Sequence, residues 1–136
     1  MKTLYLVAIL LLTTLCLSAQ SKKKVRELDI QTKTTWKVDY VDGKEVKNKE
    51  KEEKFTTSGK IAEYIEYDAD GSTKSHIKYD YSSEGKLVKE QIIGKNGAVE
   101  ETYEYSYLGK LKTEKRKLNA KGKLVSKKIY EYKTHQ

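Results

Sequence analysis

The glycines of this chain are spaced very evenly. Six of the eight fall at positions 59, 71, 85, 97, 109 and 122, with gaps of 12 to 14 residues. Asp70-Gly71 and Asn96-Gly97 are typical of two-residue hairpin turns, in which both residues take positive φ. A turn about every 12 residues leaves room for strands of about 8–10 residues. The spacing therefore predicts an antiparallel meander rather than a series of strand–helix–strand units.

The segments between these glycines alternate in kind, which makes the true repeat about 25 residues long. The segments after the second, fourth and sixth glycines carry tyrosines at their eighth and tenth positions. The segments after the other three begin with lysine followed by isoleucine or leucine. The paired tyrosines are Tyr79/Tyr81, Tyr105/Tyr107 and Tyr130/Tyr132. Three matching copies predict one hairpin per repeat and say nothing about chemistry.

Strand alternation predicts which side chains share a face of the sheet. Within residues 73–81 the tyrosines lie on one face, and Lys78 and Asp80 lie on the other. This arrangement predicts an aromatic face and a charged face, as in a sheet with one solvated side. We expect Tyr105 to face the core and Tyr107, nearer its turn, to be more exposed. The candidate binding surface comprises Tyr81, Tyr107, Tyr132 and Trp36.

The region before the repeats predicts one more hairpin. Trp36, Val38 and Tyr40 alternate along one face, and Asp42-Gly43 turns the chain. The mixed-charge stretch 47–55 fits either a long loop or a helical turn, and both readings stay open. Residues 109–118 contain three consecutive basic residues and are expected to form an edge strand that charge protects from further pairing.

These features predict an all-β fold with about eight antiparallel strands, counted from Trp36. Eight strands can lie as a twisted open sheet or close into a small barrel. We expect a single β-repeat domain over residues 35–133, preceded by a polar N-terminal segment, 20–34. The length of the chain suits one domain with a modest core.

Residues 1–19 are expected to be a signal peptide. Lys2 precedes an apolar run from Leu4 to Leu17 that is shorter than the ~20 residues needed to span a bilayer. Cleavage is predicted after Ala19, which would leave no stable transmembrane segment. The predicted location is therefore secreted or periplasmic, at the cell envelope. An uncleaved anchor and lipoprotein processing at Cys16 are the alternatives.

The residues that could carry chemistry are few. Cys16 is the only cysteine, and it leaves with the signal peptide, which excludes thiol catalysis and cysteine–zinc sites. The two histidines, His76 and His135, lack metal-ligand spacing. Neighbouring carboxylates such as Glu100 and Glu101 point to opposite faces of a strand, which disfavours joint acid–base work. We therefore expect no catalytic residue, no metal and no cofactor, and no enzymatic activity.

The repeat units resemble a known bacterial family. The stretch "EYIEYDADGSTKSHIKYDYSSEGKLVKEQ", with Tyr-Asp pairs at Tyr67-Asp68 and Tyr79-Asp80, is similar to the YD, or RHS-type, repeat. The resemblance covers about residues 54–132. It implies a secreted β-repeat fold without enzymatic activity. A competing resemblance to secreted lipocalin-like barrels rests on Trp36 and on the strand count.

These observations favour a secreted or periplasmic, non-catalytic binding or structural module acting at the cell envelope. The alternative is a small lipocalin-like barrel that carries a small ligand or a glycan. An enzyme or enzyme inhibitor with an unrecognised site is a third hypothesis. The partner is expected to be an envelope protein or a glycan.

An anionic polymer is a further candidate partner, because the formal net charge is +8, or +7 once Lys2 is removed. Nucleic acid is disfavoured, because Arg26 and Arg116 are the only arginines, and because lysines are interspersed with glutamates.

Overall fold

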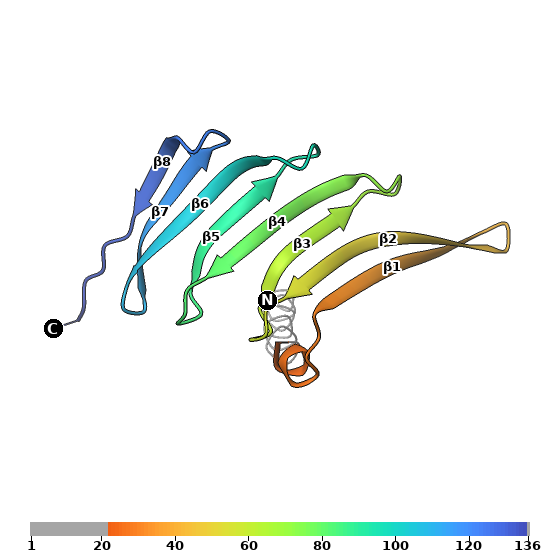
Figure 1. The fold of residues 1–136 in the computed structure, drawn as a ribbon, viewed down its shortest axis with the longest axis horizontal. Coiled ribbons are helices and arrows are strands. Elements are labelled where there is room, and N and C mark those ends of the chain that lie inside the picture. The colour runs from red at the N-terminus through yellow and green to blue at the C-terminus, as the bar shows by residue number, and fades with distance from the viewer. Residues whose placement is uncertain (1–21, 136) are drawn as a thin grey trace, which may run out of the picture.

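The computed structural model describes residues 22–135, and these form one eight-stranded antiparallel sheet in which every strand pairs with its neighbours in sequence (Figure 1). The predicted all-β meander is confirmed. The first and last strands do not pair, so the sheet is open and the small-barrel alternative is wrong. The strands are β1 (Thr32–Val41), β2 (Lys44–Phe55), β3 (Ile61–Tyr67), β4 (Thr73–Tyr81), β5 (Leu87–Ile93), β6 (Val99–Leu108), β7 (Leu111–Asn119) and β8 (Leu124–Ile129).

The predicted signal peptide, with Cys16 and its cleavage site, lies outside the described residues. Within residues 22–135, no helix is long and apolar enough to cross a bilayer. In the N-terminal segment that the sequence left as polar, residues 22–27 form a short helix, and β1 begins at Thr32.

Five of the seven hairpin connections use the same five-residue loop. In each, the first residue donates its N–H to the carbonyl of the fifth, and the glycine at the fourth position donates to the carbonyl of the first. Only the glycine has positive φ, as in a type I turn followed by a glycine bulge. The five loops are 56–60, 68–72, 82–86, 94–98 and 119–123.

This shared loop corrects the prediction for two turns. Asp70-Gly71 and Asn96-Gly97 do not form two-residue turns, because neither Asp70 nor Asn96 has positive φ. Asp42-Gly43 does form one: Asp42 has φ 51° and Gly43 has φ 75°, and Val41 pairs directly with Lys44. The same dipeptide therefore serves two turn types, and the loop length decides between them.

The charged strand that was expected at an edge lies inside the sheet. β7 pairs with β6 on one side and with β8 on the other, and the edges are β1 and β8. An interior strand tolerates this charge because Lys117 reaches Glu101 at 2.7 Å and Arg116 reaches Glu104 at 3.2 Å, both on β6. The mixed-charge stretch 47–55, left open by the sequence, forms most of β2.

The register divides the sheet into two faces, because directly paired residues point the same way. Tyr79 pairs with Glu90, which pairs with Tyr103, which pairs with Lys117. We call the face that carries these four residues the tyrosine face, and the opposite face, which carries His76, the histidine face. The predicted alternation in β4 is confirmed, but the tyrosine face also carries charges and is not purely aromatic.

The sheet has little core. Among the described residues, Val25, Ile93 and Tyr105 are the buried large side chains, at 6%, 8% and 9% exposure. Val25 belongs to the short helix, which packs on the turn between β2 and β3. An added Cβ on Gly59 would lie 2.7 Å from the carbonyl oxygen of Lys22. Apart from this helix, no second layer covers the described sheet, so most side chains are packed only by their neighbours within one layer.

Candidate functional site

Three tyrosines of the predicted binding surface hold the sheet together. The hydroxyls of Tyr81 and Tyr107 each donate to a main-chain carbonyl twenty residues earlier, on Ile61 and Leu87, at 2.8 Å. Tyr132, which follows β8, repeats the contact with the carbonyl of Lys112 at 2.6 Å. We call these contacts the tyrosine latches. Each latch joins a strand or its C-terminal extension to the preceding strand, at the end opposite their connecting turn.

Lysines connect one latch to the next repeat. The ammonium group of Lys60 lies 5.0 Å from the ring centroid of Tyr81 and donates to the carbonyl of Gly85. Lys86 lies 5.7 Å from the ring centroid of Tyr107 and donates to the carbonyl of Gly109 at 2.5 Å. These lysines follow the glycines that begin alternate segments of the repeat. Packing between repeats therefore explains two features of the sequence pattern. These are the lysine that follows each of these glycines and the tyrosine at the tenth position.

Tyr105 lies on the tyrosine face and is buried, which confirms the expectation that it faces the core. Its hydroxyl donates to the carboxylate of Glu90 on β5. Burial and this carboxylate raise the pKa of Tyr105 well above its ordinary value. Tyr107 is half-buried, and burial raises the pKa of its phenol as well. Both phenols therefore stay protonated near neutral pH.

Trp36, the fourth predicted residue, lies on a projecting arm. β3 pairs only with the stretch of β2 from Lys51 to Phe55, so the rest of β2 pairs with β1 alone. Figure 1 shows the tip of this hairpin and the C-terminus at opposite ends of the sheet. Trp36, Val38 and Tyr40 alternate along β1 and are 45%, 40% and 73% exposed. We call these three residues the apolar arm.

The apolar arm is bordered by cations. The ammonium groups of Lys47 and Lys49 lie 4.6 Å and 5.8 Å from the ring centroid of Trp36. Both lysines come from β2, directly across from β1. A ring flanked by cations and left nearly half exposed can contact a partner with apolar and acidic groups. The structure separates this residue from the latch tyrosines, with which the sequence had grouped it.

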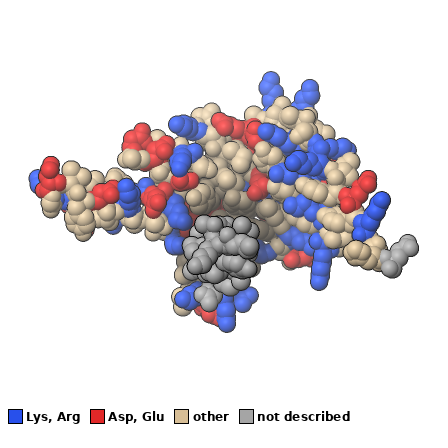
Figure 2. Space-filling model, turned by 180° about the vertical axis from the view of Figure 1, so that it is seen from behind, with Lys and Arg blue, Asp and Glu red and all other residues tan. Residues whose placement is uncertain are grey.

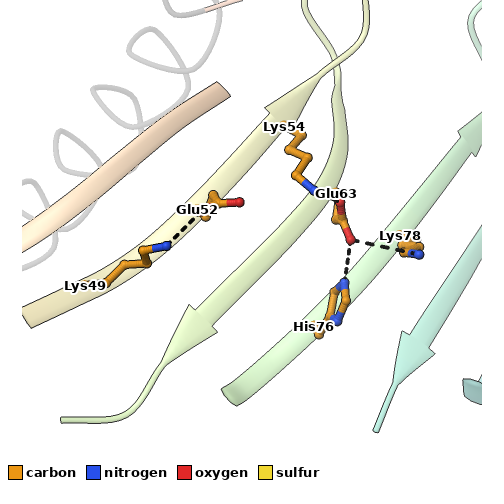
Figure 3. Close-up of polar contacts among 6 residues, drawn as sticks. All are labelled: Lys49, Glu52, Lys54, Glu63, His76 and Lys78. Atoms are coloured by element: carbon orange, nitrogen blue, oxygen red, sulfur yellow. Dashed lines mark hydrogen bonds and ion pairs between the residues drawn. The ribbon is translucent and has the colours of Figure 1, made fainter. Parts of the chain in front are cut away.

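An ion-pair cluster surrounds Glu63 on the histidine face (Figure 3). Its carboxylate lies 2.7 Å from the ammonium of Lys54, 2.7 Å from Nε2 of His76 and 4.0 Å from the ammonium of Lys78. Burial opposes ionisation of Glu63, but the hydrogen bonds from Lys54 and His76 hold its pKa below the ordinary value. Lys49 and Glu52 form a separate pair at 3.1 Å. The cluster joins β2, β3 and β4 electrostatically.

A basic region on the tyrosine face was missed by the sequence reasoning. Tyr103, Lys115, Lys117, Ser126 and Lys128 line a shallow pocket on β6, β7 and β8. The ammonium of Lys115 lies 4.4 Å from the ring centroid of Tyr103 and 5.5 Å from that of Tyr105. Figure 2, seen from behind, shows lysine and arginine side chains gathered over the C-terminal end of the sheet.

A local charge count would have found this region. Ten of the 28 Lys and Arg residues, but only two of the 20 Asp and Glu residues, lie between positions 109 and 136. The rest of the chain is balanced, so the whole net charge of +8 resides in this C-terminal part. The expectation of evenly interspersed charges holds for the first 108 residues and fails for the last 28.

Comparison with known proteins assigns no family: no protein-family model, no curated protein and no solved structure matches the chain. Within residues 22–135, no group of three or more His, Cys, Asp and Glu side chains is arranged to hold a metal ion. The described sheet carries the apolar arm at one end and the basic region at the other.

Proposed function

We propose that this chain is a secreted or periplasmic, non-catalytic β-repeat module that binds a protein partner at the cell envelope through its apolar arm. The observation that carries the proposal is the exposure of Trp36, Val38 and Tyr40 on a two-stranded projection. Exposed apolar side chains that adjoin on one surface are typical of interaction sites. Tryptophan and tyrosine are also enriched among the residues that contribute most to binding.

The packing of the sheet supports the same proposal. Twelve large apolar side chains are exposed among the described residues, whereas only three are buried. In each repeated tyrosine pair the second member, Tyr81, Tyr107 or Tyr132, forms a latch, so these rings serve the scaffold. The open sheet encloses no interior between its edges, which favours partner binding over the alternative of a small-ligand carrier. The repeat pattern, which resembles the YD family, is consistent with a scaffold of this kind.

The test is capture of envelope proteins on the immobilised mature chain, comparing wild type with Trp36→Ala/Tyr40→Ala. The expected result is a partner that the wild type retains and the arm variant loses, with an unchanged circular dichroism spectrum and melting temperature. Leu108→Ala/Ile129→Ala is the matched control, because those side chains are 75% and 62% exposed but lie outside the arm. Equal capture by the arm variant would refute a binding role for the arm.

A further inference from the structure

The strand pair β7–β8 differs from the other strand pairs of the sheet in the signs of the charges that stand opposite each other. Wherever two charged residues stand directly opposite each other in the other six strand pairs, their charges are opposite in sign; Lys33–Glu53, Lys54–Glu63 and Asp80–Lys89 are examples. Between β7 and β8, Lys115 stands opposite Lys128 and Arg116 stands opposite Lys127. Directly opposed like charges destabilise a sheet, so this pair retains an unfavourable arrangement.

The two like-charged pairs differ in how they are compensated. On the histidine face, Arg116 reaches Glu104 at 3.2 Å, and both Arg116 and Lys127 lie 3.8 Å from carboxylate oxygens of Glu114. On the tyrosine face, neither Lys115 nor Lys128 forms an ion pair within residues 22–135. The uncompensated positive charge is therefore specific to the tyrosine face.

Two further lysines, Lys112 and Lys117, continue the row of ammonium groups along the same face, and Lys117 also reaches the carboxylate of Glu101 at 2.7 Å. The ammonium of Lys112 lies 4.4 Å from the ring centroid of Tyr105, and that of Lys117 lies 5.7 Å from that of Tyr103. We call Lys112, Lys115, Lys117 and Lys128 the basic strip. The tyrosine rings position the ammonium groups of its first three lysines through cation–π contacts. Lys128 lies on the exposed edge strand β8, where a ligand has free access.

The chemistry of the basic strip indicates which polyanion fits it. All four residues are lysines, which bind anions as point charges, whereas arginine is the residue suited to bidentate phosphate contacts. The rings of Tyr103 and Tyr105 are covered by ammonium groups and offer no free platform for stacked bases. Both features disfavour nucleic acid and suit a chain of separate sulfate or carboxylate groups.

We propose that the basic strip binds an anionic polysaccharide. The ligand lies across β7 and β8 and relieves the repulsion between Lys115 and Lys128. This proposal rests on the proposed function, because it treats the chain as a binding module, but it places a second ligand at the end of the sheet away from the apolar arm. The chain would then connect a protein partner to an anionic polymer.

The experiment is isothermal titration of the mature chain with a heparin oligosaccharide at about 0.15 M salt, where screening limits nonspecific attraction. Neutral dextran and single-stranded DNA of matched charge are the comparison ligands. Lys128→Glu is the main variant, and Lys127→Glu is its matched control, because it changes the net charge equally but on the histidine face. Lys128→Glu is expected to weaken heparin binding about five- to tenfold, since it replaces an attraction by a repulsion.

Lys128→Glu also places a carboxylate opposite Lys115, which replaces a repulsion between the two strands by an attraction. The melting temperature of this variant is therefore expected to equal or exceed that of the wild type. Weaker binding by a variant that is no less stable excludes unfolding as the cause. Equal weakening by Lys127→Glu, absence of heparin binding, or tighter binding of the DNA would each overturn the proposal. None of these results alters capture through the apolar arm, which Trp36→Ala/Tyr40→Ala tests separately.

Discussion

The tyrosine latches predict a graded loss of stability when a single hydroxyl is removed. Tyr107→Phe keeps the ring and deletes the 2.8 Å hydrogen bond to the carbonyl of Leu87. A partly buried hydrogen bond of this kind contributes about 1 kcal/mol net. For a domain of this size, the loss should lower the melting temperature by about 4 °C. Tyr81→Phe should behave alike, because its hydroxyl donates to Ile61 at the same distance.

The third latch should matter less, although its hydrogen bond is shorter. Tyr132 is 52% exposed and lies beyond the last strand, so water can replace its contact with Lys112. Tyr132→Phe should therefore cost less than about 0.5 kcal/mol. Tyr81 and Tyr107 lie two strands apart, about 10 Å, so the two losses should add in the double variant, to about 2 kcal/mol.

The assay is urea denaturation followed by circular dichroism, with Tyr40→Phe as the control. Tyr40 is 73% exposed, and its hydroxyl donates to Glu45 across the hairpin at 3.3 Å, a long and exposed contact. The control should unfold at the same urea concentration as the wild type. An equal loss of stability in Tyr132→Phe and Tyr107→Phe would contradict the latch model. So would Tyr81→Phe and Tyr107→Phe variants that are both as stable as the control.

Three further predictions concern the turns and the titrating groups. Gly59→Ala should lower the free energy of unfolding more than Gly97→Ala does. Both glycines have positive φ, but only at Gly59 would the new Cβ clash with the carbonyl oxygen of Lys22. The urea concentration at the unfolding midpoint would show the difference. Because the pKa of Tyr105 is raised, its contribution to the free energy of unfolding should be complete below the ordinary tyrosine pKa of 10.0 and be lost as pH rises further. The ultraviolet absorbance of tyrosinate should rise together with unfolding. The pKa of Glu63 is lowered, so its ionised form stabilises the fold, and this stabilisation is lost as pH falls below the ordinary carboxyl pKa. Glu63→Gln should therefore lose less stability than the wild type over that pH range. Thermal melts across acid pH would test this.

The fold could be predicted largely because its signals are local and repeated. Evenly spaced glycines fix where strands end, and tyrosine alternation fixes which side of a strand is buried, so the meander and the burial of Tyr105 followed from the sequence. The turn type did not follow. Asp70-Gly71 fits either a two-residue turn or the third and fourth positions of the five-residue loop 68–72, and the choice depends on the register of the flanking strands.

The position of β7 and the role of the tyrosines required the three-dimensional arrangement. Consecutive charges in residues 109–118 indicated an edge because an interior strand is usually buried on at least one face. In a single-layer sheet the interior strand is solvated, so charges are tolerated there. The latches join residues twenty positions apart, as in Tyr107 and Leu87, and nothing in the local pattern specifies such a partner.

The basic strip was not predicted because the charge was considered over the whole chain and not segment by segment. The composition of the whole chain mixes lysine with glutamate, and only the last 28 residues depart from that balance. Even a local count would not reveal that Lys115 opposes Lys128, because cross-strand pairing depends on register. The sequence therefore predicts an excess of positive charge in this segment but not that these lysines share one face of the sheet.

Nuclear magnetic resonance would test most directly whether the anionic ligand binds at the lysines of β7 and β8 and leaves the strands joined by the Tyr81 latch untouched. An isotope-labelled chain of residues 20–136 would be titrated with a heparin oligosaccharide, and the amide shifts assigned along the sheet. We expect changes at Lys112, Lys115, Lys117 and Lys128, with the amides of β3 and β4 and the latch residue Tyr81 unaffected. Changes concentrated on β3 and β4, or spread evenly over the sheet, would contradict this division of roles.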